Sequence, residues 1–277
     1  MKGAILAGGL GTRLYPLTHA TNKHLLPIYD QPMIFYPIQT LVRAGIKEIM
    51  VVTGGPHAGD FIQVLKNGEE LNLNLKHLEY AYQENPLGGI ADALSFCEDF
   101  ADKDSLCVIL GDNCTDANIK KEVQSFKKGA KTFLKEVPDP QRFGVAVFSA
   151  KGGSASGRKI KNQKSQPKAG PPRAEKCKNQ NEITPQTHRI IKIEEKPKKP
   201  KSNLAVTGLY IYDKKVFDYI RKIKPSDRGQ LEITDVNNLY IKAKKLDWAI
   251  LDGFWSDAGT FETLFGTSKY WAEKKLK

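Results

Sequence analysis

A short apolar run leads directly into a glycine cluster near the start of the chain. Residues 3–13 read GAILAGGLGTR, a predicted strand followed by three closely spaced glycines. Glycines at the end of a strand let the backbone amides approach a phosphate closely. Arg13 and Lys23 follow and supply positive charge beside the loop. The feature predicts an α/β fold with a phosphate-binding loop at the carboxyl end of its first strand.

The spacing around this loop excludes two common phosphate-binding motifs. Leu14 stands where the dinucleotide-binding fingerprint has its third glycine. No acidic residue stands in the right place for a ribose either. The sequence contains no GxxxxGKS or GxxxxGKT, so a P-loop kinase or ATPase is not expected. A tight turn followed by solvated charges is the alternative interpretation of this loop.

Composition indicates a globular, cytoplasmic protein. The chain has 277 residues, of which 40% are hydrophobic and 9% aromatic, which is enough for a sizeable core. We expect no membrane span, because no apolar stretch approaches the ~18 residues that one requires. The first residues are too soon broken by glycine to form a signal peptide. The four cysteines have spacings that match neither a zinc site nor a disulfide framework, and we expect them to be structural.

Short apolar runs alternate with amphipathic stretches through the first half of the chain. This alternation predicts an α/β fold with a central mixed, mainly parallel sheet flanked by helices. The expected strands there are 3–7, 48–53, 76–82 and 105–110, and the expected helices are 33–44, 57–65 and 90–100. The second half is richer in strands, expected at 131–137, 143–148, 189–194, 204–212 and 248–255, with helices at 215–223, 233–242 and 260–274.

The segment 151–189 departs from this pattern. It holds ten of the Lys and Arg residues against two acids, and so carries most of the net charge of +12. It is rich in Gly, Ser, Asn, Gln and Pro, a composition that cannot bury enough apolar surface to fold by itself. We interpret 1–277 as a single domain and 151–189 as a basic, flexible insertion at a hairpin tip. The alternative is a basic arm for an anionic partner.

Two aspartates are candidate metal ligands. Asp112 follows the apolar run SLCVIL and Gly111, at the sheet edge where open α/β folds place their ligands. Asp257 precedes Ala258 and Gly259 in the stretch FWSDAGT. Mg²⁺ takes one or two protein carboxylates together with substrate oxygens. The alternatives are a helix cap at each position.

The stretch IEEKP, at residues 193–197, ends another expected strand. Glu195 is placed to accept hydrogen bonds from sugar hydroxyls, and Lys196 to hold a monophosphate. A charged strand end before a proline turn is the alternative.

Seven stretches together resemble the bacterial and archaeal sugar nucleotidyltransferases. They are GGLGTRLYPLT, NKHLLPIYDQPMIFYPIQTL, LGDN, RFGVAVF, EEKP, AVTGLYIYD and GQLEITDVN, in the same order over residues 1 to about 265, interrupted only at 151–189. Within the family, the glucose-1-phosphate thymidylyltransferases are most similar. The resemblance implies a nucleotidyltransferase variant of the Rossmann-like fold. It also implies a reaction in which a sugar 1-phosphate and a nucleoside triphosphate give a nucleotide-sugar and pyrophosphate.

The resemblance also assigns roles to individual residues. The nucleotide phosphates are expected beside Gly8, Gly9, Gly11, Thr12, Arg13 and Lys23, and the pyrimidine base beside Gln83 and Gly88. Mg²⁺ is expected on Asp112 and Asp257, and the sugar 1-phosphate among Gly144, Glu195, Lys196 and Val206. Arg13, Lys23, Asp112 and Lys196 are the expected catalytic residues. A homo-oligomer is implied, with no membrane or specific nucleic-acid partner.

Two positions depart from the family pattern. Phe143 stands where thymidylyltransferases commonly have a tyrosine, and residues 84–94 read ENPLGGIADAL where the family has a PDGLAQA type. We expect glucose 1-phosphate and dTTP as substrates, with UTP or another sugar 1-phosphate as the alternative. A glycosyltransferase is disfavoured because no acid stands two residues after Asp112. A non-catalytic binding protein that uses the basic insertion is the alternative from another class.

Overall fold

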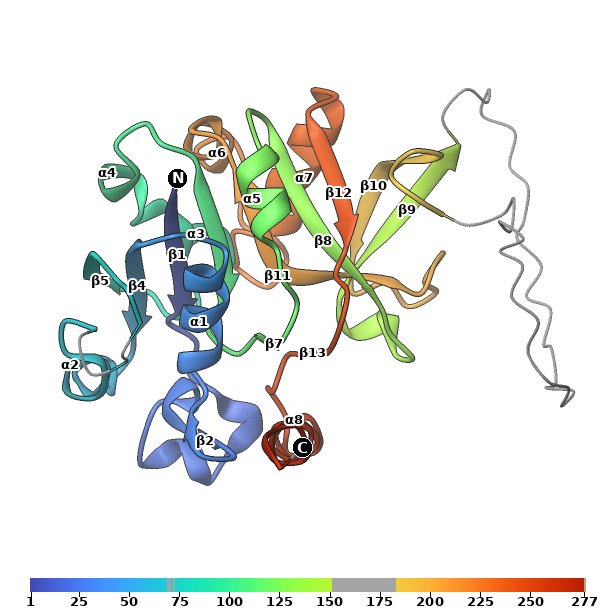
Figure 1. Cartoon of the computed structure of the whole chain (residues 1–277). Coiled ribbons are helices and arrows are strands. Elements are labelled where there is room, and N and C mark those ends of the chain that lie inside the picture. The colour runs from blue at the N-terminus through green and yellow to red at the C-terminus, as the bar shows by residue number, and fades with distance from the viewer. Residues whose placement is uncertain (69–70, 72, 151–182, 277) are drawn as a thin grey trace, which may run out of the picture.

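The computed structural model describes residues 1–68, 71, 73–150 and 183–276. In this part of the chain a nine-stranded mixed sheet is covered by helices (Figure 1). Its strands are β1 (Lys2–Ala7), β4 (Glu48–Gly54), β5 (His77–Gln83), β6 (Leu106–Leu110), β8 (Ala130–Glu136), β9 (Gly144–Ala150), β10 (His188–Glu195), β11 (Leu204–Tyr212) and β12 (Leu246–Ile250).

The helices connect or follow these strands. They are α1 (Phe35–Arg43), α2 (Ala58–Leu65), α3 (Ile90–Ser95), α4 (Glu98–Ala101), α5 (Lys120–Ser125), α6 (Lys215–Ile220), α7 (Ile233–Lys242) and α8 (Phe261–Lys275). Within the described residues, none of them combines the length and the apolar character that crossing a membrane requires.

The strand order places the ends of β1 and β6 side by side. β1 pairs in parallel with β4 on one side and with β6 on the other, and β5 lies outside β4. The chain thus leaves β1 toward β4 and β5 and later returns to the opposite side of β1. Open α/β sheets bind ligands at such a reversal, outside the carboxyl ends of the strands. The glycines after β1 and the residues after β6 share this edge.

Antiparallel strands extend the sheet beyond β6. β11 pairs antiparallel with β6, β8 and β9, β10 pairs antiparallel with β9, and β12 lies parallel to β8. The predicted mixed α/β fold is confirmed, and its parallel half is the one that carries the glycine cluster.

Alternate residues of the parallel strands belong to two different buried hydrophobic clusters. In β1, Ala4 and Leu6 belong to one buried cluster, whereas Ile5 and Ala7 belong to the other. This is the period of two that a strand imposes on its side chains. Because both faces are covered by helices, the strands read as continuous apolar runs, and that is why the sequence reveals them.

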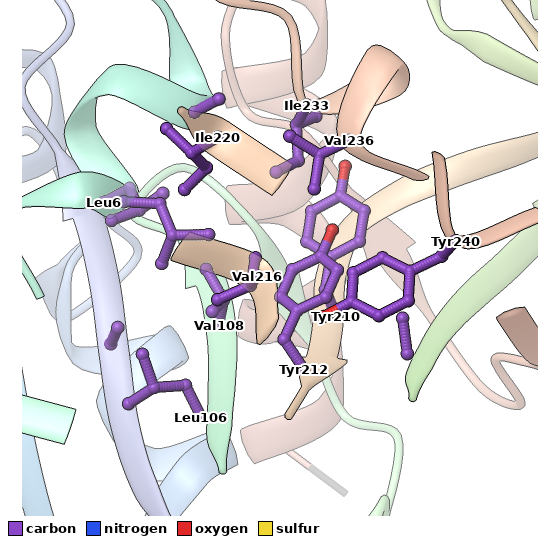
Figure 2. Packing of buried hydrophobic residues seen from close by; sticks show 14 of the residues in the cluster. Leu6, Leu106, Val108, Tyr210, Tyr212, Val216, Ile220, Ile233, Val236 and Tyr240 are labelled. Atoms are coloured by element: carbon purple, nitrogen blue, oxygen red, sulfur yellow. The ribbon is translucent and has the colours of Figure 1, made fainter. Parts of the chain in front are cut away.

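The first cluster contains a group of stacked tyrosines (Figure 2). The rings of Tyr210 and Tyr212 on β11 lie 5.6 Å apart, and Tyr240 on α7 stacks 5.8 Å from Tyr212. The hydroxyl of Tyr212 is fully buried and donates to Asn237 Oδ1 at 2.7 Å. The stack fixes α7 against the sheet.

A third, smaller cluster attaches α8. It joins Trp271 of α8 to Tyr36, with ring centroids 4.8 Å apart, and it includes Cys114 and Ala258. Two short pairs of strands lie beside it: β2 (Pro27–Ile28) with β3 (Gln31–Pro32), and β7 (Cys114–Thr115) with β13 (Trp255–Ser256). The β7–β13 pair connects the end of the sheet to the stretch that leads into α8.

Three expected boundaries were wrong. The helix expected at 90–100 is interrupted at Phe96 and Cys97, where Cys97 N–H bonds to the Leu94 carbonyl in a tighter turn. The strand expected at 248–255 is two strands, because Gly253, at φ +82°, turns the chain out of the sheet after β12.

The third concerns the predicted insertion. Its last two residues, His188 and Arg189, belong to β10 and pair with Ala150 and Ser149 of β9. The segment therefore lies between two antiparallel neighbours. Residues 151–182 lie outside the described part of the chain, so the predictions for them, and that of a single domain, stay predictions.

We predict that Tyr212→Phe lowers the free energy of unfolding by about 1–2 kcal/mol, because it leaves Asn237 Oδ1 buried without its donor. Urea denaturation followed by circular dichroism measures this. Tyr219→Phe is the matched control, since Tyr219 packs edge-on against Tyr240 at 4.6 Å and its hydroxyl makes no hydrogen bond within the described residues. Equal stability of the two variants would contradict the prediction.

Candidate active site

The glycine cluster forms a tight loop over the end of β1. Gly11 has φ +69°, and its N–H and carbonyl lie at the start of a 3₁₀ turn over Thr12–Leu14. A Cβ at Gly11 would lie 2.9 Å from Cβ of Lys23 and 3.1 Å from Cγ2 of Thr18. Glycine is therefore needed here both for the left-handed backbone and for the space. The loop places Thr12 and Arg13 on the exposed side.

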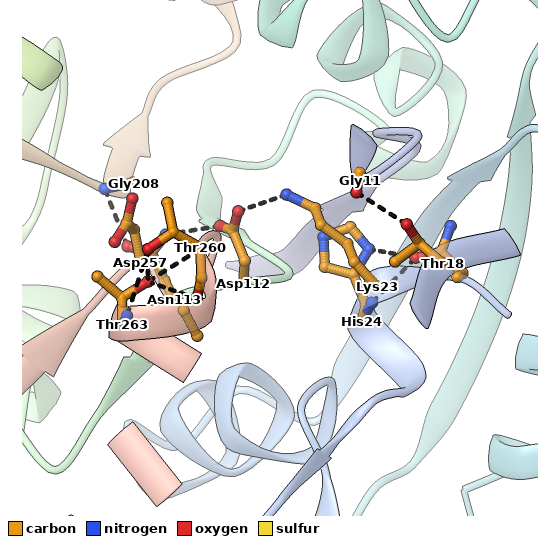
Figure 3. A network of polar contacts seen from close by, with 12 residues as sticks. Gly11, Thr18, Lys23, His24, Asp112, Asn113, Gly208, Asp257, Thr260 and Thr263 are labelled. Atoms are coloured by element: carbon orange, nitrogen blue, oxygen red, sulfur yellow. Dashed lines mark hydrogen bonds and ion pairs between the residues drawn. The ribbon is translucent and has the colours of Figure 1, made fainter. Parts of the chain in front are cut away.

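Lys23 runs along this loop to the end of β6. Its Nζ lies 2.5 Å from Oδ2 of Asp112, and the two side chains are only 13% and 11% exposed (Figure 3). A Cβ at Gly9 would be 3.6 Å from Lys23 Cε, so the lysine stem lies against the loop. The structure thus brings the glycine loop, Lys23 and Asp112 together.

The charge of Asp112 is maintained in spite of its burial. Burial alone would raise the pKa of this carboxyl, but the Lys23 charge and hydrogen bond bring the pKa below its usual value. Asn113 Nδ2 donates to the other carboxylate oxygen at 3.1 Å. Asn113 Oδ1 in turn accepts from the Gly208 N–H and from Trp255 Nε1. These contacts fix the carboxylate to β11 and β13.

His24 lies beneath the lysine–aspartate pair. Its Nδ1 donates to Asn22 Oδ1 at 2.7 Å, and that oxygen also accepts from the His24 N–H. A Cβ at Gly111 would be 2.7 Å from Cδ2 of His24, so glycine is required for the ring to fit. Burial lowers the pKa of His24 to about 3, and the Lys23 charge adds to this effect. The ring is therefore neutral at physiological pH.

The β7–β13 pair brings Asp257 toward Asp112. Ser256 pairs with Cys114, so Asp257 follows one strand of the pair where Asp112 and Asn113 precede the other. Burial raises the pKa of Asp257, and the Asp112 charge raises it further. Arg142 Nη2 contacts Asp257 Oδ2 at 2.9 Å, and the charges of Arg13 and Lys23 also act to lower that pKa.

The two carboxylates fit a magnesium ion. They are hard oxygen donors, and burial together with the charge of Asp112 raises the pKa of Asp257. The described residues hold no group of three or more His, Cys, Asp or Glu side chains arranged around a metal position. A site with two carboxylates and open positions suits Mg²⁺, which keeps waters and substrate phosphates as its other ligands.

Gln83 lies against Gly8 of the glycine loop, and Gly88 lies against Asp92. Gln83 ends β5, its side chain is buried, and its Nε2 donates to Asp92 Oδ2 at 2.7 Å. A Cβ at Gly54 would meet Gly8 Cα at 3.2 Å, so β4 and the loop approach closely here.

The residues expected around the sugar 1-phosphate gather at the ends of β9 and β10. Glu195 pairs with Gly144 in the antiparallel register, and its Oε2 accepts from Thr234 Oγ1 at 2.7 Å. Lys196 is half exposed, with Nζ 3.9 Å from Glu195 Oε1. Val206 is buried in β11.

The sequence reasoning missed several partners of these residues. Arg142, Asn113, Arg228 and Asp92 each contact one of the predicted site residues. Asn113 and Arg142 belong to the stretches LGDN and RFGVAVF, and Asp92 lies within 84–94, but no role was predicted for any of them. Arg228 directly precedes the stretch GQLEITDVN. Membership of these stretches, or position beside one, was the signal that could have found them.

The model of the nucleotidyl transferase family matches residues 2–172 and 177–274. The chain belongs to this family. Among curated members, the glucose-1-phosphate thymidylyltransferase of Neisseria meningitidis serogroup A is 37% identical over 276 residues, which span 98% of this chain and 82% of the relative. That of Mycobacterium tuberculosis is 36% identical, with the same coverage of both chains.

Solved structures of nucleotidyl transferases have the same fold. A Bacillus anthracis protein assigned as a glucose-1-phosphate thymidylyltransferase, in complex with a sucrose, gives a TM-score of 0.77 at 44% identity. The match covers 98% of this chain and 94% of that one. UDP-glucose pyrophosphorylase in complex with UDP-glucose gives a TM-score of 0.74, covering 99% of each chain. Its identity of 20% supports the fold alone.

We predict that acidification destabilises the protein through His24. The pKa of this base is depressed by folding from 6.5 to about 3. The contribution of neutral His24 to the free energy of unfolding is therefore complete above pH 6.5 and is lost as the pH falls toward 3. Between pH 7 and 5 the loss is about 2 kcal/mol.

Urea denaturation at pH 7 and pH 5 measures this effect. His24→Gln keeps a neutral hydrogen-bonding side chain and should lose less stability than the wild type over this interval. His77→Gln, at an exposed position, is the control and should behave like the wild type. An unchanged pH dependence in His24→Gln would show that the histidine does not stay neutral in the folded protein.

Proposed function

We propose that the chain joins glucose 1-phosphate to dTTP and releases dTDP-glucose and pyrophosphate. The observation that carries the proposal is the buried pair of Lys23 and Asp112, which lies between the glycine loop and the second aspartate. Positive charge for a triphosphate and carboxylates for a metal thus share one sheet edge. The thymidylyltransferase relatives, similar over almost the whole chain, support the choice of substrates.

The glycine loop is the proposed phosphate site. Gly8, Gly9, Gly11 and Thr12 would present the backbone to the triphosphate, while Arg13 and Lys23 offset its charge. Gln83 and Gly88 would contact the base. Lys196 would hold the phosphate of the sugar, Glu195 would accept from sugar hydroxyls, and Gly144 and Val206 would leave room for the ring.

The proposed reaction is a single in-line displacement. An oxygen of the sugar phosphate forms a bond to the α-phosphorus as the bond from that phosphorus to the bridging oxygen of the β-phosphate breaks. The electron pair leaves with pyrophosphate, and no covalent enzyme intermediate forms. The attacking phosphate is already a dianion, so no general base is required. Catalysis consists of positioning by Lys196 and electrostatic stabilisation by Arg13 and Lys23.

Asp112 and Asp257 would hold Mg²⁺, which supplies charge neutralisation for the triphosphate when bound. Lys23 would keep Asp112 ionised and oriented, because its ammonium group already contacts that carboxylate. Arg142 would do the same for Asp257. UTP or another sugar 1-phosphate stays the alternative substrate. A homo-oligomer and a cytoplasmic location are part of the proposal, and the family resemblance supports the first.

We predict that Lys23→Ala and Asp112→Ala each lower turnover by ~100-fold or more, the usual scale for one preorganised electrostatic group. The measurement is pyrophosphate release with glucose 1-phosphate, dTTP and Mg²⁺. Each change leaves the partner charge buried and unpaired, which destabilises the fold. Lys23→Met and Asp112→Asn are therefore measured beside them, and circular dichroism checks that each variant is folded.

Lys121→Ala is the control, since Lys121 is exposed on α5, away from the loop. It should retain wild-type turnover. Near-normal turnover in a folded Lys23 or Asp112 variant would contradict the proposal.

A further inference from the structure

The amide of Gln83 is hydrogen-bonded at its nitrogen end and lies against the glycine loop at its oxygen end. The side chain is 3% exposed, and its Nε2 donates to Asp92 Oδ2 at 2.7 Å and to the Gly89 carbonyl at 3.3 Å. At the other end, Oε1 lies only 2.3 Å from the position that a Cβ on Gly8 would occupy. The amide thus bridges from the start of α3 to the glycine loop.

The surroundings decide which end of the amide is nitrogen. A carboxylate is a pure acceptor, and so is a backbone carbonyl. Both lie at the same end of the Gln83 amide, so this end must be the NH₂ group. The opposite end is therefore the carbonyl oxygen. Among the described residues no hydrogen bond reaches Oε1, which leaves it a free acceptor beside the glycine loop.

The backbone makes room for this arrangement. A Cβ at Gly88 would lie 2.3 Å from Asp92 Oδ2, so only glycine leaves space for the carboxylate. Gly89 has φ +97°, and the turn is fastened by bonds from Leu231 N–H to the Gly88 carbonyl and from Ala91 N–H to the Leu231 carbonyl. The position of Asp92 relative to Gln83 is therefore fixed by the local backbone rather than by the amide alone.

An acceptor in this position distinguishes between bases. Thymine and uracil carry a donor at ring N3, in the centre of the edge that a side chain can read. Cytosine has an acceptor at N3. Two acceptors facing each other leave both unpaired, which is costly in a buried site. If the amide were free to flip, its NH₂ group would instead suit the N3 of cytosine.

We propose that Asp92 is a specificity-determining positioning residue: it holds the Gln83 carbonyl oxygen toward N3–H of thymine or uracil and thereby disfavours cytosine. The inference rests on the proposed function, in which Gln83 contacts the base. Asp92 does not touch the base itself, and acts through Gln83.

The test compares Asp92→Asn with the wild type, using pyrophosphate release with glucose 1-phosphate and Mg²⁺. Asparagine has the same shape but offers a donor as well as an acceptor, so only the longer contact with the Gly89 carbonyl still opposes a flip of the Gln83 amide. We expect kcat/KM for dTTP to fall about tenfold and the dTTP-to-CTP ratio of kcat/KM to fall at least about tenfold. Glu84→Gln removes the same charge from an exposed neighbour and should keep the wild-type ratio.

The nucleotide ratio separates positioning from a purely structural role. If Asp92 only stabilised the start of α3, both nucleotides would lose activity in parallel and the ratio would stay constant; that result overturns the inference. Asp92→Ala, which removes the partner altogether, is measured in case Asp92→Asn is unfolded, and the same fall in ratio is expected. A wild-type protein inactive with both dTTP and UTP would instead refute the proposed function.

Discussion

The ion pair between Lys23 and Asp112 is the interaction on which the rest of the site depends. It joins a loop that follows β1 to the end of β6, and both side chains are almost buried at a separation of 2.5 Å. Burying two charges costs several kcal/mol for each ion, and mutual attraction offsets this only with good geometry and further hydrogen bonds. Asn113 supplies one such bond. Because an apolar pair could stabilise the fold equally well, we interpret the buried charges as part of a ligand-binding site.

Carboxylates and cations lie together around this pair, and such an arrangement suits a polyanionic ligand that binds with a metal ion. Burial and the charge of Asp112 raise the pKa of Asp257, and Arg142 balances the charge of Asp257 through an ion pair. Backbone geometry makes room for this arrangement, since Gly11 leaves space for Lys23 and Gly111 leaves space for the His24 ring. The neutral His24 supports the pair without adding a charge of its own.

The sequence predicted the parallel half of the fold and the main chemical groups, because each of them is encoded locally. Buried parallel strands are continuous apolar runs, and Asp112 follows one of them after a single glycine. The position of Asp257 depended on the pairing of two strands of two residues each, which no local pattern reveals. The contact of the Asp92 carboxylate with Gln83, nine positions earlier in the chain, depends on the turn at Gly88 and Gly89, which the helical periodicity of 90–100 does not indicate. The interruption of the helix after Ser95 is a tighter turn, which the continuous apolar periodicity of 90–100 does not indicate.

Pyrophosphate release by the wild-type protein with glucose 1-phosphate and Mg²⁺, measured separately with dTTP, UTP, CTP, ATP and GTP, tests the account most directly. It examines the phosphate loop, the paired charges and the orientation of Gln83 in one experiment. The account predicts strong release with dTTP, weaker release with UTP, and little with CTP or ATP. Release that is strongest with CTP or ATP, or none with any of the five, would contradict it.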